Sequence, residues 1–109
     1  MKRGDVVTVA APGDFGKPRP AVIIQTDLLN ETHPTILVCL ITSAVRQPSP
    51  FRLLVEPNGN NGLRKPSMIM VDKITTMRRE KVGSIIGRLD EQTMRMLDRS
   101  LLFVCGLAR

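Results

Sequence analysis

The feature that most constrains the fold is a series of short apolar runs separated by Pro, Gly and Asn. Turn residues at such close intervals favour short β-strands over long helices. The longest run, TILVCLITS (35–43), is almost entirely apolar and rich in β-branched residues. Such a run predicts a central strand that is buried on both faces. The chain is therefore expected to be mainly β.

Further strands are expected in the other apolar runs. Their ranges are 5–11, 19–26, 51–57, 67–77 (as one or two strands) and 83–89. Residues 12–18 and 58–65 are rich in Gly, Pro and Asn and are expected to form loops. Asp27 is a candidate N-cap for one short helical turn that runs to Glu31.

The last part of the chain has a helical period instead. Its apolar residues recur at helical spacing at Met94, Leu97, Leu101 and Val104. Asp90 is a good N-cap, and Gly106 can end the helix in a left-handed conformation. We predict a single domain over residues 1–109, mainly β in the α+β class: a small twisted sheet or half-barrel with a short helix, closed by a C-terminal amphipathic helix.

The chain carries an excess of positive charge. Sixteen Lys and Arg residues against ten Asp and Glu residues give a net charge of +6 in 109 residues. Such an excess favours a polyanionic partner, either nucleic acid or an acidic protein segment. Most of these cations are arginine, which is well suited to bidentate recognition of phosphate.

The sequence predicts neither a membrane-spanning segment nor a signal peptide. No apolar run approaches membrane-spanning length, and the one that follows the N-terminus is too short for a signal peptide. We expect a cytoplasmic protein with no membrane partner. Cys39 and Cys105 lie far apart without metal-ligand spacing, and they are expected to be buried free thiols.

Several kinds of catalytic site are disfavoured. The NGNNG segment lacks the spacing of a phosphate-binding loop, and the single histidine, His33, has no marked nucleophile to serve. The acidic residues form no close pair for glycosidase or two-metal chemistry. We expect no metal and no cofactor. With no Trp or Tyr and three Phe, an aromatic stacking platform is also unexpected.

What remains is a guanidinium and hydroxyls at strand ends. Arg19 stands between Pro18 and Pro20, which restrict its backbone to extended geometry. Thr42 and Ser43 end the central strand. A surface arginine and hydroxyls that satisfy backbone groups are one interpretation. Convergence of Arg19 and Thr42 on a phosphate is the other, and composition does not choose between them.

Five segments in order resemble one family. KRGDVV, KPRPAVIIQTD, LVCLITSAV, IMVDKITTM and IGRLDEQTMRMLDRSLL are similar to segments of the MazF/PemK (Kid-like) toxins of type II toxin–antitoxin systems. The resemblance runs from residue 2 to about residue 104 without large insertions. It implies the plasmid-toxin fold, an SH3-like half-barrel with helices.

The resemblance also implies an activity. Members of the family are growth inhibitors that act as homodimers, cleave single-stranded RNA at a short sequence without a metal, and are neutralised by an acidic antitoxin. The ribose 2′-OH attacks the adjacent phosphate and leaves a 2′,3′-cyclic phosphate. The family's catalytic arginine corresponds to Arg19 and its catalytic threonine to Thr42.

Other positions correspond to the family's RNA groove. These candidate RNA-binding residues are Phe15, Lys17, Ser43, Arg46, Gln47, Asp72 and Lys73. Lys73 stands where some relatives have glutamine. The 12–18 loop lacks the glutamate that many relatives carry there. Asp14 is its one acidic residue, and the general base stays unassigned.

Two alternative functions stay open. A DNA gyrase poison of the CcdB type would share the fold, but those proteins end in a tryptophan-containing tail, whereas this chain ends CGLAR and has no Trp. A non-catalytic nucleic-acid-binding module on the same fold, or a toxin relative that has lost activity, is the second.

Overall fold

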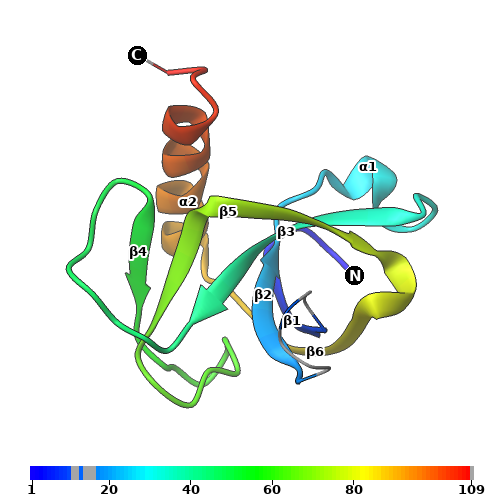
Figure 1. Ribbon diagram of the computed structural model, residues 1–109, viewed down its shortest axis with the longest axis horizontal. Helices are drawn as coiled ribbons and strands as arrows, with labels where there is room; N and C mark the ends of the chain where they lie inside the picture. The colour runs from blue at the N-terminus through cyan, green and yellow to red at the C-terminus, as the bar shows by residue number, and fades with distance from the viewer. Residues whose placement is uncertain (11–12, 14–16, 109) are drawn as a thin grey trace.

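Six antiparallel strands form one sheet in the computed structural model, which describes residues 1–10, 13 and 17–108 (Figure 1). The strands are β1 (Asp5–Val9), β2 (Arg19–Ile23), β3 (Thr35–Thr42), β4 (Arg52–Val55), β5 (Ser67–Arg78) and β6 (Val82–Arg88). Their order in the sheet is β4-β5-β3-β2-β1-β6. Two α-helices complete the described part, α1 (Asp27–Asn30) and α2 (Glu91–Val104). The prediction of a mainly β fold with a C-terminal helix is confirmed.

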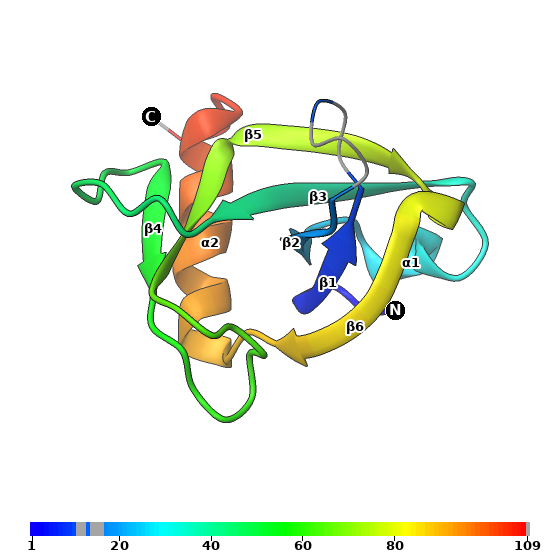
Figure 2. The same ribbon diagram turned by 60° about the horizontal axis from the view of Figure 1, so that its bottom comes forward.

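The sheet is strongly curled. β5 lies next to the edge strand β4, whereas β6 forms the other edge beside β1. Only the 3-10 turn η1 (Arg79–Lys81) connects β5 to β6. Three residues span about 10 Å at most, so the sheet must curl until its far edge approaches the end of β5. Figure 2 shows β6 curving back in this way toward the start of α2.

Two apolar clusters fill the two faces of the sheet. Inside the curl lie Val7, Val9, Ala21, Ile23, Ile36, Val38 and Met77. The opposite face buries Val6, Val22, Cys39, Ile41, Val55, Leu63, Ile69, Val71 and Leu89 with Leu97 of α2. Successive side chains of a strand point to opposite faces, so β1, β2 and β3 contribute alternately to both clusters.

The C-terminal helix forms as its caps predict. The Asp90 carboxylate accepts a hydrogen bond from the Thr93 N–H at 2.7 Å, and Gly106 adopts φ 73° after the last turn. Leu97 is fully buried. α2 lies against β4 and β5, and α1 lies at the other end of the sheet (Figure 1).

The predicted cap of α1 is wrong. Thr26 is the N-cap, because its hydroxyl oxygen accepts from the Leu28 N–H at 3.3 Å. The Asp27 carboxylate instead accepts from the backbone N–H of Arg3 at 2.7 Å and from the Asn30 amide at 2.9 Å. The first of these bonds is the main reason that the pKa of Asp27 lies below 3.8.

The expected double burial of β3 holds only in part. Leu37 keeps 37% of its surface exposed. It lies on the same face as Cys39, two residues along the strand, and pairs with Thr76 of β5. α2 covers the other end of this face (Figure 1), so the sheet extends beyond the helix.

Both cysteines are free thiols, as predicted, but only one is buried. Burial raises the pKa of the Cys39 thiol to about 12. Cys105 is exposed because it follows the last turn of α2. Among the described residues, no helix has the length and apolar character needed to cross a membrane.

Candidate nucleic-acid groove

A groove of about 1030 Å³ opens at the ends of β2 and β3. The described residues that line it are Thr8, Pro18, Arg19, Pro20, Leu40, Ile41, Thr42, Ser43, Gly62, Leu63, Arg64, Lys65, Ser67, Met70, Lys73 and Ile86. They come from five strands, from the loop between β4 and β5, and from two positions next to strands, Pro18 before β2 and Ser43 after β3. The groove is therefore a tertiary feature rather than the property of one motif.

Arg19 and Thr42 lie at the same end of two neighbouring strands. Ala21 pairs with Leu40 and Val22 with Cys39 in the antiparallel ladder of β2 and β3. The pairing ends there, with Arg19 two residues before Ala21 and Thr42 two residues after Leu40, so both lie at the same end of the two neighbouring strands. Because successive side chains alternate between faces, Arg19 and Thr42 share the face of Ala21 and Leu40. Both residues line the groove.

The Thr42 hydroxyl satisfies a backbone group at the end of β3. Its oxygen accepts a hydrogen bond from the Ala44 N–H at 3.1 Å. A hydroxyl that accepts in this way keeps its own O–H for donation. Thr42 thus satisfies a backbone group at the strand end and can also donate a hydrogen bond into the groove.

β5 is distorted beside the groove, where its pairing with β3 is interrupted. Ile69 pairs with Ile41 and Ile74 pairs with Cys39, so residues 70–73 of β5 all lie opposite Leu40. Extra residues in one strand bend it and break the ladder, and Figure 1 shows the bend in β5. Leu40, Met70 and Lys73 line the groove where the two strands separate.

The lining is one-sided in charge. Arg19, Arg64, Lys65 and Lys73 contribute four cations, and none of the lining residues that the structure describes is Asp or Glu. Low-dielectric walls that carry charge of one sign concentrate the local field. The groove is suited to a polyanion.

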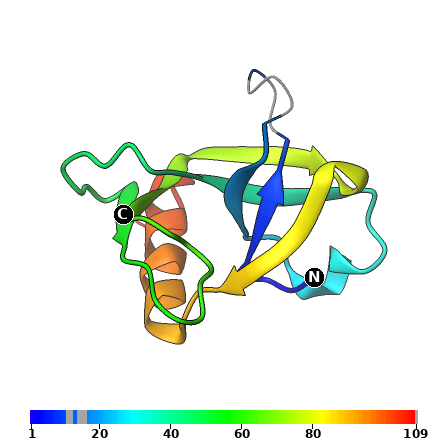
Figure 3. The ribbon, with the colours of Figure 1, turned by 90° about the horizontal axis from the view of Figure 1, so that it is seen from below.

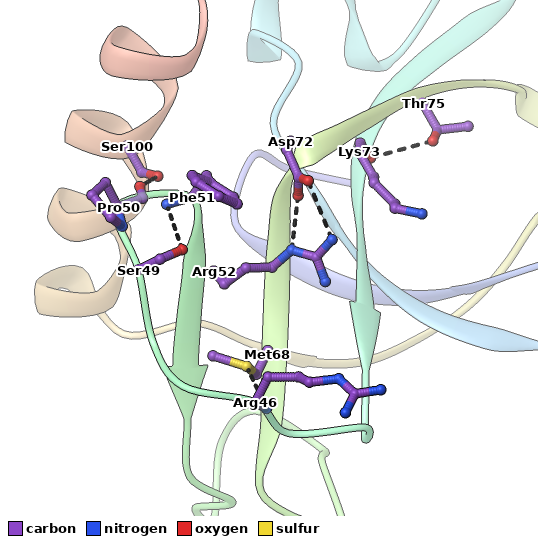
Figure 4. A network of polar contacts seen from close by, with 10 residues as sticks. All are labelled: Arg46, Ser49, Pro50, Phe51, Arg52, Met68, Asp72, Lys73, Thr75 and Ser100. Carbon is purple, nitrogen blue, oxygen red and sulfur yellow. Dashed lines mark hydrogen bonds and ion pairs between the residues drawn. The ribbon is translucent and has the colours of Figure 1, made fainter.

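Four of the predicted site residues meet in this groove, namely Arg19, Thr42, Ser43 and Lys73. Lys17, Arg46, Gln47 and Asp72 are not among its described lining residues. The Asp72 carboxylate accepts two hydrogen bonds from Arg52, at 2.9 and 3.2 Å (Figure 4). Phe15 and Asp14 lie outside the described residues.

The segment that carries Arg46 and Gln47 runs along the molecule outside the groove. Both side chains are exposed. The Arg46 N–H donates to the Met68 sulfur at 3.2 Å, and the Ser100 hydroxyl of α2 donates to the Pro50 carbonyl (Figure 4). These contacts tie the segment to β5 and α2.

Sequence reasoning missed two of the groove cations, Arg64 and Lys65. They follow NGNNG, and the only signal in the sequence is a pair of cations between a turn-rich segment and a strand. The backbone carbonyl of His33, the histidine for which the sequence marks no nucleophile, accepts a hydrogen bond from the Arg79 side chain at 2.9 Å. Within the described part of the chain, no three His, Cys, Asp or Glu side chains form a group that could hold a metal ion.

Comparisons with known proteins agree on one family. The family described as "PemK-like, MazF-like toxin of type II toxin-antitoxin system" matches residues 2–105. A "Probable endoribonuclease MazF" of Mycolicibacterium smegmatis is 41% identical over 109 residues, which cover 99% of both chains. The endoribonuclease EndoA of Bacillus subtilis is 27% identical over 106 residues, with 93% of this chain and 90% of the relative covered.

Solved structures share the fold. An endoribonuclease from a mycobacterial species, solved in complex with its cognate antitoxin, superposes with a TM-score of 0.84 at 20% identity, covering 100% of this chain and 98% of that one. The Mycobacterium tuberculosis toxin MazF-mt6 superposes with a TM-score of 0.81 at 22% identity, covering 94% and 96%.

Proposed function

Because this chain belongs to the PemK-like, MazF-like toxin family of type II toxin–antitoxin systems, we propose that it is an endoribonuclease that cleaves single-stranded RNA in its cationic groove. The observation that supports the proposal is that Arg19 and Thr42 line one groove, at the same end of two adjacent strands. The names of its relatives support the same reaction class.

The proposed reaction needs no cofactor. The 2′-OH of one ribose attacks the adjacent phosphorus, and the bond from phosphorus to the 5′-oxygen of the next nucleotide breaks. One fragment ends in a 2′,3′-cyclic phosphate, and the other ends in a 5′-OH after its oxygen takes a proton. Negative charge grows on the non-bridging oxygens along the way.

Arg19 and Thr42 are assigned to that growing charge. Fixed donors aimed at the position of a developing oxyanion accelerate such steps by about 10²–10³ each. The Arg19 guanidinium offers several N–H donors in a fixed planar array together with a delocalised positive charge. A permanent cation suits charge stabilisation, or donation to the leaving oxygen, better than proton abstraction.

The prolines at positions 18 and 20 support this role. They restrict the backbone on both sides of Arg19 before any substrate arrives. A side chain on a preorganised backbone loses less conformational freedom when it engages a phosphate. The general base has no candidate among the described lining residues, which include no carboxylate or imidazole.

Cleavage in EDTA tests the proposal. The chain is incubated with single-stranded RNA, and the product ends are identified by mass spectrometry and by direct phosphorylation of 5′-OH ends. We expect cleavage in EDTA with cyclic phosphate and 5′-OH ends. Cleavage only after Mg²⁺ is added, or 5′-phosphate ends, would overturn the mechanism. RNA that stays intact under every condition would overturn the assignment of the chain as a nuclease.

The proposed partners follow from the same groove. An acidic antitoxin segment would occupy it in place of RNA, since both are polyanionic. We also propose that the chain acts in the cytoplasm as a homodimer. Exposed apolar side chains on the second half of α2 and just after it, Leu102, Phe103 and Leu107, support self-association. Sedimentation equilibrium should give twice the mass of the chain, and a single-chain mass would contradict the dimer.

A further inference from the structure

The loop of residues 56–66, between β4 and β5, is held by its own buried amide. Asn61 is 1% exposed. Its side-chain oxygen accepts from the N–H groups of Asn58 at 3.3 Å and Leu63 at 3.0 Å, and its side-chain nitrogen donates to the Glu56 carbonyl at 2.9 Å. One side chain thus closes the loop by satisfying three backbone groups, which gives a defined conformation.

The same loop lies directly on β6. The Arg88 N–H donates to the Asn60 carbonyl at 2.8 Å. A Cβ on Gly62 would lie 2.1 Å from the Ile86 carbonyl oxygen, and one on Gly87 would lie 2.3 Å from the Asn61 carbonyl carbon. Figures 2 and 3 show the loop reaching the end of β6. Two glycines therefore allow a backbone-to-backbone approach that no other residue type permits.

Arg64 and Lys65 stand between two anchored residues. Leu63 before them is buried in the apolar cluster beneath α2, and Ser67 after them is buried at the start of β5, where its hydroxyl donates to the Lys65 carbonyl at 2.8 Å. Both cations are exposed and line the groove. Their backbone is thus ordered before a ligand binds, which lowers the entropic cost of engaging one.

The groove is larger than one phosphate requires. Its volume of about 1030 Å³ is at the upper end of the range of roughly 300–1,000 Å³ for pockets that hold small ligands. Arg64 and Lys65 reach it from a part of the chain separate from the strand ends that carry Arg19 and Thr42. The groove therefore offers cations to more than one phosphate of a strand.

We propose that Arg64 and Lys65 bind phosphates of the RNA strand next to the one that is cleaved. The loop forms a preformed second wall that fixes the path of the RNA. This inference rests on the proposed function and extends it to residues outside the catalytic pair. The two cations position the substrate without touching the reacting phosphate.

Salt-dependent binding tests the proposal. The probe is a short fluorescent RNA of mixed sequence with 2′-O-methyl groups, which has no attacking hydroxyl. For single strands, log K falls with log salt by about 0.7 for each phosphate contact. The double variant R64Q/K65Q should therefore show a slope shallower by about 1.4 and an affinity lower on the order of 20-fold at about 0.1 M salt.

A matched variant removes the same charge elsewhere. Arg78 and Lys81 are exposed at the opposite end of β5 from Ser67, and neither is among the described lining residues. The double variant R78Q/K81Q should keep the wild-type slope. Equal losses in both double variants would show a general charge effect and would overturn the proposal.

Cleavage kinetics separate positioning from chemistry. Loss of contacts that are equally strong in the ground and transition states raises KM and leaves kcat unchanged, so R64Q/K65Q should raise KM alone. A wild-type salt slope in this variant would overturn the role of the loop while leaving the nuclease intact. A wild-type chain that binds the probe but cleaves no RNA would overturn the proposed function, and the slopes would still decide the role of the loop.

Discussion

The groove lining and the surface outside it differ in their acidic residues. Outside the groove, four arginines lie beside carboxylates: Arg3 beside Asp98 at 2.7 Å, Arg52 beside Asp72 at 2.9 Å, Arg88 beside Asp5 at 2.9 Å and Arg95 beside Glu91 at 3.0 Å. The groove has four cations and no acidic residue among its described lining residues. The net charge of +6 is thus distributed unevenly.

This difference shows where the positive charge can act. Paired charges on an exposed surface contribute roughly 0–1 kcal/mol each and are screened by salt. Cations gathered in one cleft raise the local concentration of a polyanion and speed its association. The overall charge of a chain therefore indicates a class of partner, and the arrangement of its acids indicates the site.

The largest expected effect is the loss of the Arg19 guanidinium. Arg19→Ala should lower kcat for RNA cleavage by about 10³, because it removes a charged donor from the reacting phosphate. The matched substitution Arg95→Ala, which breaks an exposed ion pair on α2, should leave cleavage unchanged. Rates are compared in single-turnover assays after circular dichroism confirms the fold. Equal rates for the two variants would remove the distinction between groove and surface.

Loss of the Thr42 hydroxyl should come next. Thr42→Val keeps the shape of the side chain and should lower the cleavage rate by about 10². Thr42→Ser keeps the hydroxyl and should stay near the wild-type rate. If serine and valine reduce the rate alike, the methyl group matters and the hydroxyl does not donate to the phosphate.

An uncharged substitution can displace the second wall of the groove. An alanine at position 87 would meet Asn61 backbone atoms that cannot move independently of the loop, so Gly87→Ala should lower the free energy of unfolding by about 1–3 kcal/mol and weaken RNA binding. Gly59→Ala, where a Cβ meets nothing within 4 Å, should change neither. Urea unfolding and the salt-slope assay measure the two effects. If Gly87→Ala binds RNA as the wild type does, the contact between β6 and the loop of residues 56–66 has no role in RNA binding.

The smallest expected effect is a change in the pH dependence of stability when Asp90, the N-cap of α2, is replaced. The Thr93 N–H holds the pKa of this carboxyl below 3.8 in the folded chain. Its contribution to stability is therefore complete above pH 3.8 and is lost as pH falls through the lower folded value. Asp90→Asn keeps a good cap that does not titrate. The stability of the variant relative to the wild type should rise on acidification, and parallel pH profiles would contradict this.

Local sequence patterns predicted the elements better than their surroundings. The helical spacing of apolar residues from Met94 to Val104 sufficed to predict α2, because its cap, Asp90, and its apolar stripe are neighbours in the sequence. The cap of α1 could not be predicted in this way: Asp27 is drawn away by the N–H of Arg3, which is distant in sequence. The exposure of Leu37 likewise depends on how far α2 extends over the sheet.

The residues of the candidate site also fall into two groups, those that the sequence predicted and those that only the structure identified. Arg19, Thr42, Ser43 and Lys73 could be chosen from the sequence because they lie in the segments KPRPAVIIQTD, LVCLITSAV and IMVDKITTM, which resemble the family. Arg64 and Lys65 could not, because their place depends on Asn61 and on two glycines that let the loop approach β6.

By itself, the sequence determined the strand and helix segments, the excess of positive charge and the family likeness, since each is a property of neighbouring residues or of totals. Only the tertiary structure decided which cations share a cleft and which of the described acidic residues line none of it. Electrostatic interactions depend on distance in space and on the surrounding medium, and neither can be read from positions along the chain.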